Sequence, residues 1–213
     1  MLFFSHSGIT LGVGWLLKST CPGNLADPAG KNEPEQALDS LPSASPAGSP
    51  SLGLRAQLVK LIRKADLRLL LVGSLLPDII DKPIGQVFFR ETFSSGQIFA
   101  HTLLFLIVIT LLGIYVYRGW GKSWLIVLSF ATFIHLIQDQ MWLVPRTILW
   151  PLYGWAFEKI DLTHWVQNIF HAMRTAPRVY VPELVGVIIL AGFVVTLAYR
   201  KKVYAFIRNG QAL

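Results

Sequence analysis

The sequence predicts an all-α, polytopic integral-membrane protein with about four to five hydrophobic helices plus an interfacial or re-entrant segment. Two observations predict this fold class. Of the 213 residues, 53% are hydrophobic and only 15% are charged, whereas a soluble domain usually carries about 25% charged residues. The hydrophobic residues also gather in runs that approach or reach the roughly 20 residues that a helix needs to cross a bilayer. A chain disordered over most of its length is therefore excluded, and a membrane protein is strongly favoured.

Five apolar segments follow one another along the chain. The first, 2–17, is short and lacks the basic residues that precede a cleaved secretory signal, so we expect the mature protein to keep it. The second, 67–80, is also short, whereas the third and the fifth, 98–117 and 180–199, are clear spans. The fourth, 123–144, is long enough to cross but contains several polar residues. Residues 148–157 are apolar but too short to cross, which indicates an interfacial or re-entrant segment.

Composition divides the chain into four regions. Residues 1–21 hold the first hydrophobic helix, and residues 22–54, rich in Pro, Ser and Gly, are predicted to form a flexible loop because they cannot bury enough apolar surface to fold. Residues 55–158 are the predicted helical membrane core, which opens with a basic amphipathic stretch expected to lie on anionic lipid. Residues 159–213 are expected to hold an interfacial segment, the last transmembrane helix and a basic tail.

The positive residues predict an orientation. If all five segments cross, 13 of the 19 Lys and Arg residues lie on one side of the membrane. The positive-inside rule then places this side and the C-terminus in the cytoplasm, with the N-terminus outside. Such an excess in a membrane protein sets orientation more often than it binds nucleic acid, so no nucleic-acid partner is predicted. The single cysteine, Cys21, excludes a disulfide framework and a thiolate zinc site.

The sharpest chemical signal is the pair His135 and Asp139 inside an apolar segment. Positions i and i+4 lie on one face of a helix, so an imidazole nitrogen and a carboxylate oxygen can reach one metal ion. An Asp at mid-helix costs about 2.5–3.5 kcal/mol on insertion scales and therefore needs a partner, an ion or a water-filled cavity. The alternative is a His–Asp hydrogen bond that only joins helices.

Four more candidate ligands lie near the ends of other segments. Asp78 and Asp81 close the second segment and share a face of one helical turn, although a helix boundary wetted by headgroups is the simpler alternative. His101 begins the third segment and His6 lies early in the first, where each alone is more simply an interfacial histidine. Alternating topology brings all these residues toward the non-cytoplasmic side. We therefore predict a divalent metal site, with zinc the first choice and manganese or iron also acceptable, made by His6, Asp78, His101, His135 and Asp139.

Other polar residues carry weaker signals. His164 and His171 are expected to pack at the interface, with an outer-shell or proton-shuttle role as the alternative. Glu183, at the start of the last segment, is expected to neutralise Arg174 or Arg178. No Gly-x-Ser-x-Gly elbow is present, so a serine hydrolase has no visible nucleophile.

The same residues, in the same order, resemble the YdjM-type family of inner-membrane metal-dependent hydrolases. The family pattern is an early His followed by Leu-Leu-Pro-Asp-x-Asp, Gly-His-Arg-Gly-x-Thr-His-Ser, His-x-x-x-Asp and Leu-Trp-Pro. The resembling residues here are His6, Leu75-Leu-Pro-Asp78, Ala100-His101-Thr102, His135-x-x-x-Asp139 and Leu149-Trp150-Pro151. The resemblance covers roughly residues 1–17 and 67–155. Two departures stand out: the second Asp is displaced by one position to Asp81, and Ser95-Gly96-Gln97-Ile98 replaces the Gly-His-Arg-Gly segment.

The resemblance implies a hydrolase of the bacterial inner (cytoplasmic) membrane. A metal in the outward-facing site would lower the pKa of bound water toward 7 for attack on a phosphoester, and a lipid phosphoester suits a site beside headgroups. Asp81, as general base or bridging ligand, and His101 are the predicted catalytic residues, and membrane lipids are the expected partners. The alternative is a non-catalytic membrane protein, either a degenerate hydrolase scaffold or a metal or proton carrier. The apolar remainder of the third and fifth segments disfavours a path through the membrane.

Overall fold

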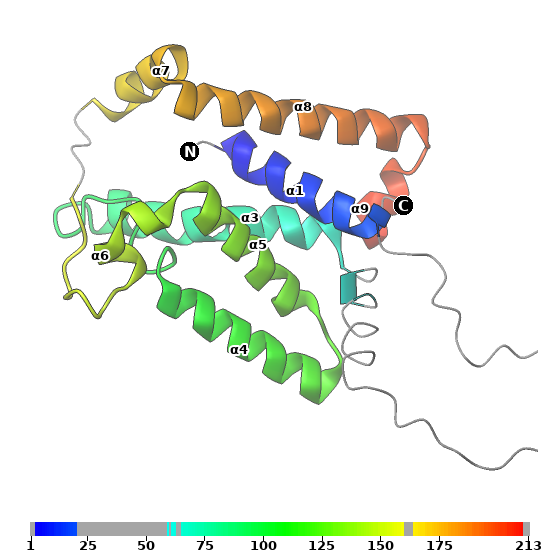
Figure 1. Ribbon diagram of the computed structural model, residues 1–213, viewed down its shortest axis with the longest axis horizontal. Helices are drawn as coiled ribbons and strands as arrows, with labels where there is room; N and C mark the ends of the chain where they lie inside the picture. Colours follow the sequence, from blue (N-terminus) through cyan, green and yellow to red (C-terminus); the bar gives the residue numbers. More distant parts are fainter. Residues whose placement is uncertain (1–2, 21–58, 60, 63–64, 160–163, 211–213) are drawn as a thin grey trace, which may run out of the picture.

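The structure, a computed structural model, describes residues 3–20, 59, 61–62, 65–159 and 164–210. Cys21, the predicted loop 22–54 and most of the basic amphipathic stretch lie outside the described residues. In the described part every regular element is helical (Figure 1), which confirms the all-α class there. The elements are α1 (Phe3–Thr20), α3 (Leu67–Lys82), the π-helical turn η1 (Pro83–Phe88), α4 (Leu103–Trp120), α5 (Trp124–Gln138), the 3-10 turn η2 (Met141–Leu143), α6 (Pro145–Ile148), α7 (Trp165–Thr175), α8 (Pro177–Tyr199) and α9 (Val203–Asn209).

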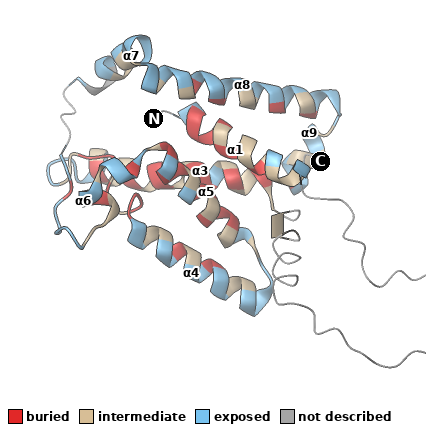
Figure 2. Cartoon of the chain, in the orientation of Figure 1, coloured by how far each residue is buried: buried red, intermediate tan, exposed pale blue. Residues whose placement is uncertain are grey.

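Five longer helices pack in a row. Helix α1 contacts α8 on one side and α3 on the other, α3 contacts α5, and α5 contacts α4, so the order across the bundle in Figure 1 is α8, α1, α3, α5, α4. Buried residues concentrate on the three central helices, whereas α4 and α8 expose most of their surface (Figure 2). The central apolar core consists of Leu11, Leu67, Leu70, Val127, Ala131, Phe193 and Leu197.

Side chains at the helix ends explain where α3 and α4 begin. The Asp66 carboxylate accepts a hydrogen bond from the Arg68 backbone N–H at 2.9 Å, which caps α3, and the Arg68 side chain donates to the Ile207 carbonyl in α9. Thr102 caps α4 by accepting from the Phe105 N–H at 3.0 Å. Gly121 ends α4 with a positive φ of 66°, the left-handed conformation that glycine adopts without strain.

Two of the predicted segment boundaries are wrong. The third apolar segment was expected to be helical from residue 98, but α4 begins at Leu103 because the backbone before it wraps around the Asp81 carboxylate. The fourth was expected to run to residue 144, but α5 ends at Gln138, and Gln140 has a positive φ of 53° that breaks the helix. Residues 148–157 form the end of α6 and turns, in agreement with a segment too short to cross.

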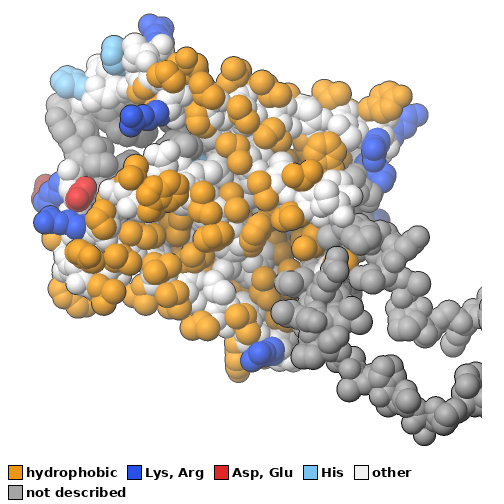
Figure 3. Space-filling model, viewed as in Figure 1, with side chains coloured by type: hydrophobic (Ala, Val, Ile, Leu, Met, Phe, Trp, Pro, Cys, Tyr) orange, Lys and Arg blue, Asp and Glu red, His pale blue; other side chains and the backbone are white. Residues whose placement is uncertain are grey.

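Helices α4 and α8 are long and apolar enough to cross a membrane, and α5 is a shorter apolar helix. Their large apolar side chains point outward: Leu111, Ile188 and Val195 are each at least 60% exposed. Figure 3 shows hydrophobic side chains over most of one face, with Lys and Arg toward the edges. Soluble monomers rarely expose apolar patches of this extent, so this surface suits lipid rather than water. The number of membrane crossings stays a prediction.

Candidate metal centre

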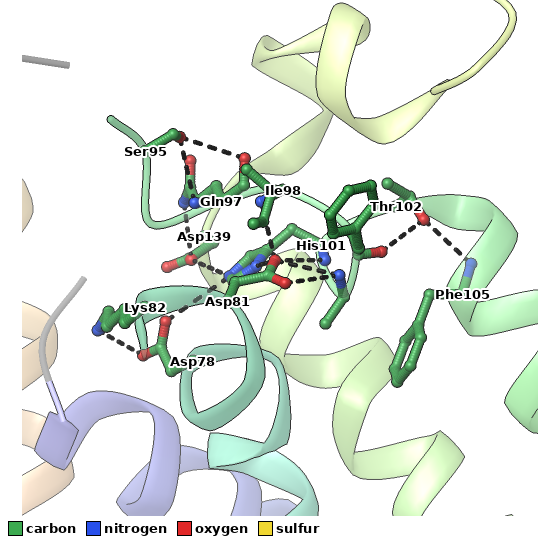
Figure 4. A network of polar contacts seen from close by, with 12 residues as sticks. Asp78, Asp81, Lys82, Ser95, Gln97, Ile98, His101, Thr102, Phe105 and Asp139 are labelled. Carbon is green, nitrogen blue, oxygen red and sulfur yellow. Dashed lines mark hydrogen bonds and ion pairs between the residues drawn. The ribbon is translucent and has the colours of Figure 1, made fainter. Parts of the chain in front are cut away.

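The structure brings all six predicted site residues together at one end of the bundle. His6 comes from the first turns of α1, Asp78 and Asp81 from the last turns of α3, and His101 from the segment before α4. His135 lies in the last turn of α5, and Asp139 is the C-cap residue of the same helix. All three histidines and Asp81 are 0% exposed. Figure 4 shows the network around His101, where both α3 carboxylates and Asp139 meet.

The Nε2 atoms of the histidines face one another. His101 Nε2 lies 3.1 Å from His135 Nε2. The His6 ring stacks on the His135 ring with 4.1 Å between centroids, and His6 Nε2 lies 3.1 Å from Asp139 Oδ1 without hydrogen-bonding geometry. Three imidazole nitrogens from three separate parts of the chain therefore converge on one small volume.

Two carboxylates complete this volume. Asp139 Oδ2 lies 3.5 Å from the Nε2 atoms of both His101 and His135, and Asp78 Oδ1 lies 3.7 Å from His101 Nε2. Two triads have ligand atoms within 4.8 Å of one another: His6, Asp78 and His135, and His101, His135 and Asp139. These triads share His135, which has a single nitrogen facing the centre. Because one nitrogen binds one ion, the two triads describe one shared cluster rather than two independent sites.

Hydrogen bonds on the far side of two rings fix their orientation. His101 Nδ1 lies 2.7 Å from Asp81 Oδ2, and His135 Nδ1 lies 2.6 Å from the Ser74 carbonyl oxygen. These acceptors hold a ring proton at Nδ1, so in the neutral form of each ring Nε2 presents its lone pair to the centre. Metal-binding histidines are usually held in this way by a carboxylate or a carbonyl.

Asp81 lies behind His101 rather than beside the converging Nε2 atoms. Its carboxylate also accepts hydrogen bonds from the backbone N–H groups of Ile98 at 2.8 Å, Ala100 at 2.9 Å and His101 at 3.2 Å. With four donors on two oxygens, this carboxylate fixes the segment that carries His101. Its predicted roles as general base or bridging ligand are not tested by this arrangement, but the geometry favours positioning.

Three partners of the site were not predicted. The Gln97 amide donates to Asp139 Oδ2 at 3.0 Å, and Lys82 Nζ lies 2.8 Å from Asp78 Oδ2 at i+4 on the same helix. The Lys82 pairing was readable from its spacing. The contact between Gln97 and Asp139 joins residues 42 positions apart in the sequence. The third partner, the Ser74 carbonyl that accepts from His135, is a backbone group. Neither contact can be predicted from a pattern of side chains.

The electrostatics of the cluster favour a cation at its centre. Burial alone would lower the pKa of His101, which lies outside the two candidate spans, but its contacts with Asp139 and Asp81 raise this pKa to about 9. The acceptor atoms thus already favour a positive charge on the ring. Zinc–nitrogen bonds of 2.0–2.1 Å place two nitrogens of a tetrahedral site about 3.3 Å apart. The observed 3.1 Å between His101 and His135 Nε2 fits this separation.

The other predicted polar residues lie away from the cluster. His164 and His171 are exposed, one at the start of α7 and one within it. Within the described chain Glu183 forms no ion pair with Arg174 or Arg178, so the predicted neutralisation is wrong. Its carboxylate instead accepts a hydrogen bond from the Phe4 backbone N–H at 3.1 Å.

Comparison with known proteins identifies a family. No curated protein and no solved structure matches this chain. The model of the YdjM inner membrane protein family matches residues 44–206. This match extends beyond the residues on which the resemblance rested and includes α8, and it begins after His6. Since it spans well over half of the 213 residues, the chain belongs to the YdjM inner membrane protein family.

Proposed function

We propose that the chain is a membrane-bound, metal-dependent hydrolase acting on phosphoesters, with lipid phosphoesters the favoured substrates. One observation carries the proposal: His101 and His135 are each held at Nδ1 and present Nε2 to a buried centre lined by Asp78 and Asp139. A hydrogen-bonded cluster that only joined helices would not need its acceptors to face one another.

Each residue has a distinct part in this proposal. His6, Asp78, His101, His135 and Asp139 would hold the ion, with zinc the first choice for a site of imidazole and carboxylate ligands. A bound divalent ion would supply Lewis acidity and lower the pKa of a water molecule bound to it toward 7. Asp81 fixes the His101 ring, and Gln97 holds Asp139. The Lys82 side chain, 39% exposed, places a positive charge beside Asp78 where an anionic substrate can approach.

The proposed orientation places the site toward the outer face of the bacterial inner membrane, with all five apolar segments crossing. The site lies at the N-terminal ends of α1, α4 and α8 and the C-terminal ends of α3 and α5. The opposite ends carry Lys18, Arg118, Lys122 and the run Arg200–Lys202. The positive-inside rule assigns that basic end, and the C-terminus beyond it, to the cytoplasm.

A non-catalytic scaffold is the second candidate, and Gln97 is the observation that favours it. This neutral side chain stands where the resemblance has an Arg, and its amide is engaged by Asp139. Such a site would bind a metal yet lack an Arg to hold an anionic substrate. Metal content and hydrolysis must therefore be measured separately.

The first experiment is elemental analysis of the full chain purified in detergent, with His135→Ala beside the wild type. Stoichiometric metal in the wild type and its loss in the variant are expected. His171→Ala is the matched control, because this histidine is exposed and lies outside the cluster. The metal-loaded protein is then assayed on p-nitrophenyl phosphate and on phospholipid in mixed micelles.

The outcomes separate the two candidates. Metal binding with hydrolysis that His135→Ala abolishes supports the enzyme. Metal binding without hydrolysis of any phosphoester supports the scaffold. A wild type that binds no metal after reloading with zinc, manganese or iron refutes both metal-dependent functions.

A further inference from the structure

Glu183 is a buried carboxylate on α8 beside the first turn of α1. It is 5% exposed, and one of its oxygens accepts the hydrogen bond from the Phe4 N–H. The other, Oε1, has no hydrogen-bond partner in the described chain. The first backbone N–H groups of a helix have no partner within the helix, and its N-terminal end attracts negative charge. Glu183 thus caps α1 from a neighbouring helix.

The backbones of α1 and α8 meet one turn further along α8. A methyl group added to Gly186 would overlap the Phe4 carbonyl oxygen and lie 2.7 Å from Ser5 Cα. A methyl group added to Gly8 would in turn overlap the backbone of Gly186. No side chain separates the helices here, so the position of α8 determines the position of the first turn of α1.

This turn carries His6, whose ring, unlike those of His101 and His135, is not oriented by a hydrogen bond at Nδ1 to any described residue. His101 and His135 are oriented by Asp81 and by the Ser74 carbonyl, respectively. By contrast, His6 Nδ1 is buried and has no hydrogen-bond partner in the described chain. The direction of the His6 ring therefore depends on its stacking against His135 and on where the backbone of α1 is held.

We propose that Glu183 is a positioning residue of the metal site, which holds the first turn of α1 so that His6 Nε2 points at the cluster. The inference rests on the proposed metal-binding function and adds to it a residue 44 positions beyond Asp139 in the sequence. The required group is an oxygen acceptor at the Phe4 N–H. The side-chain amide of Gln supplies the same acceptor without the charge.

The test is a zinc titration of the full chain in detergent, with a competing chelator, for wild type, Glu183→Ala, Glu183→Gln, His6→Ala and the double variant. Substitutions behind a metal ligand typically weaken metal binding about 10- to 100-fold, and we expect a loss of about tenfold for Glu183→Ala. Glu183→Gln should bind nearly as tightly as the wild type. In the His6→Ala background, Glu183→Ala should cause no further loss, because the ligand that it positions is already absent.

A control variant and a fallback keep the test decisive. Gly192→Ala, on the same helix, adds a methyl group that meets no atom within 4 Å and should leave zinc affinity unchanged. If Glu183→Ala does not fold, Glu183→Asp replaces it, since one methylene fewer withdraws the carboxylate from the Phe4 N–H. Equal losses with and without His6, or no loss in either background, would overturn the positioning role. A wild type that binds no zinc would instead refute the metal-binding function itself.

Discussion

Asp81→Asn changes a buried carboxylate that receives four donors without changing its size. The Asn carbonyl can take the place of one oxygen, but the amide then turns its own N–H groups toward a backbone donor such as Ala100 N–H. A buried donor left unpaired costs about 1–3 kcal/mol. The His101 ring also loses its negatively charged partner at Nδ1. Both effects loosen the segment that carries His101.

We expect Asp81→Asn to weaken zinc binding about 10- to 100-fold, equivalent to about 1.4–2.8 kcal/mol. The measurement is a zinc titration in detergent with a competing chelator. Asp66→Asn is the matched control, because that carboxylate caps the other end of α3 and pairs with Arg68 outside the site. Its substitution should leave zinc affinity unchanged.

A role as general base makes the opposite prediction for the same variant. Asp81→Asn would then bind zinc as tightly as the wild type and lose only hydrolysis. Unchanged affinity would refute the positioning role derived from the four donors.

Three further predictions follow from packing and charge. Gly186→Ala should destabilise the protein by about 1–3 kcal/mol through overpacking against α1, whereas Gly192→Ala should not destabilise it. Thermal unfolding in detergent compares the two variants. Equal unfolding temperatures would contradict the close approach of α1 and α8. Thr110 and Ser129 join α4 to α5 by a hydroxyl–hydroxyl hydrogen bond. A double-mutant cycle of Thr110→Val with Ser129→Ala should therefore give a coupling free energy of about 0.6 kcal/mol. Zero coupling would show that this hydrogen bond does not stabilise the packing of α4 on α5. The pKa of His101 in the folded protein is raised from 6.5 to about 9. Its contribution to the stability of the metal-free protein is therefore complete below pH 6.5 and is lost as the pH rises toward about 9. Across this pH range the unfolding temperature should fall in the wild type but not in His101→Ala.

The parts of the site that could be predicted depend on local spacing. His135 and Asp139 share a face because they lie four residues apart, and apolar runs fix which helices carry them. Alternation of those helices then brings His6, Asp78 and His101 to the same end. Each step uses only periodicity and chain direction, which a single sequence displays.

The parts that could not be predicted depend on backbone groups. Ile98 and Ala100 are apolar and extend the run that becomes α4, yet their N–H groups bind Asp81 and keep them out of the helix. The Ser74 carbonyl that orients His135 belongs to α3 backbone that any residue type would supply. The number of membrane crossings is equally hidden, because α1, α3 and α5 carry the polar residues of the site and fall short of the length or hydropathy of α4 and α8.

The chemical balance of the cluster argues against a purely structural role. Hydrogen-bonded contacts between helices require a donor opposite each acceptor. Here the atoms that face the centre, His101 Nε2, His135 Nε2 and the oxygens of Asp78 and Asp139, are all acceptors when both Nδ1 atoms carry the protons. A proton or a metal ion at the centre would satisfy several of these acceptors at once, and the two compete for the same lone pairs. Zinc binding should accordingly release protons from the metal-free protein at pH 7, and zinc bound without proton release would show that the ion sits elsewhere.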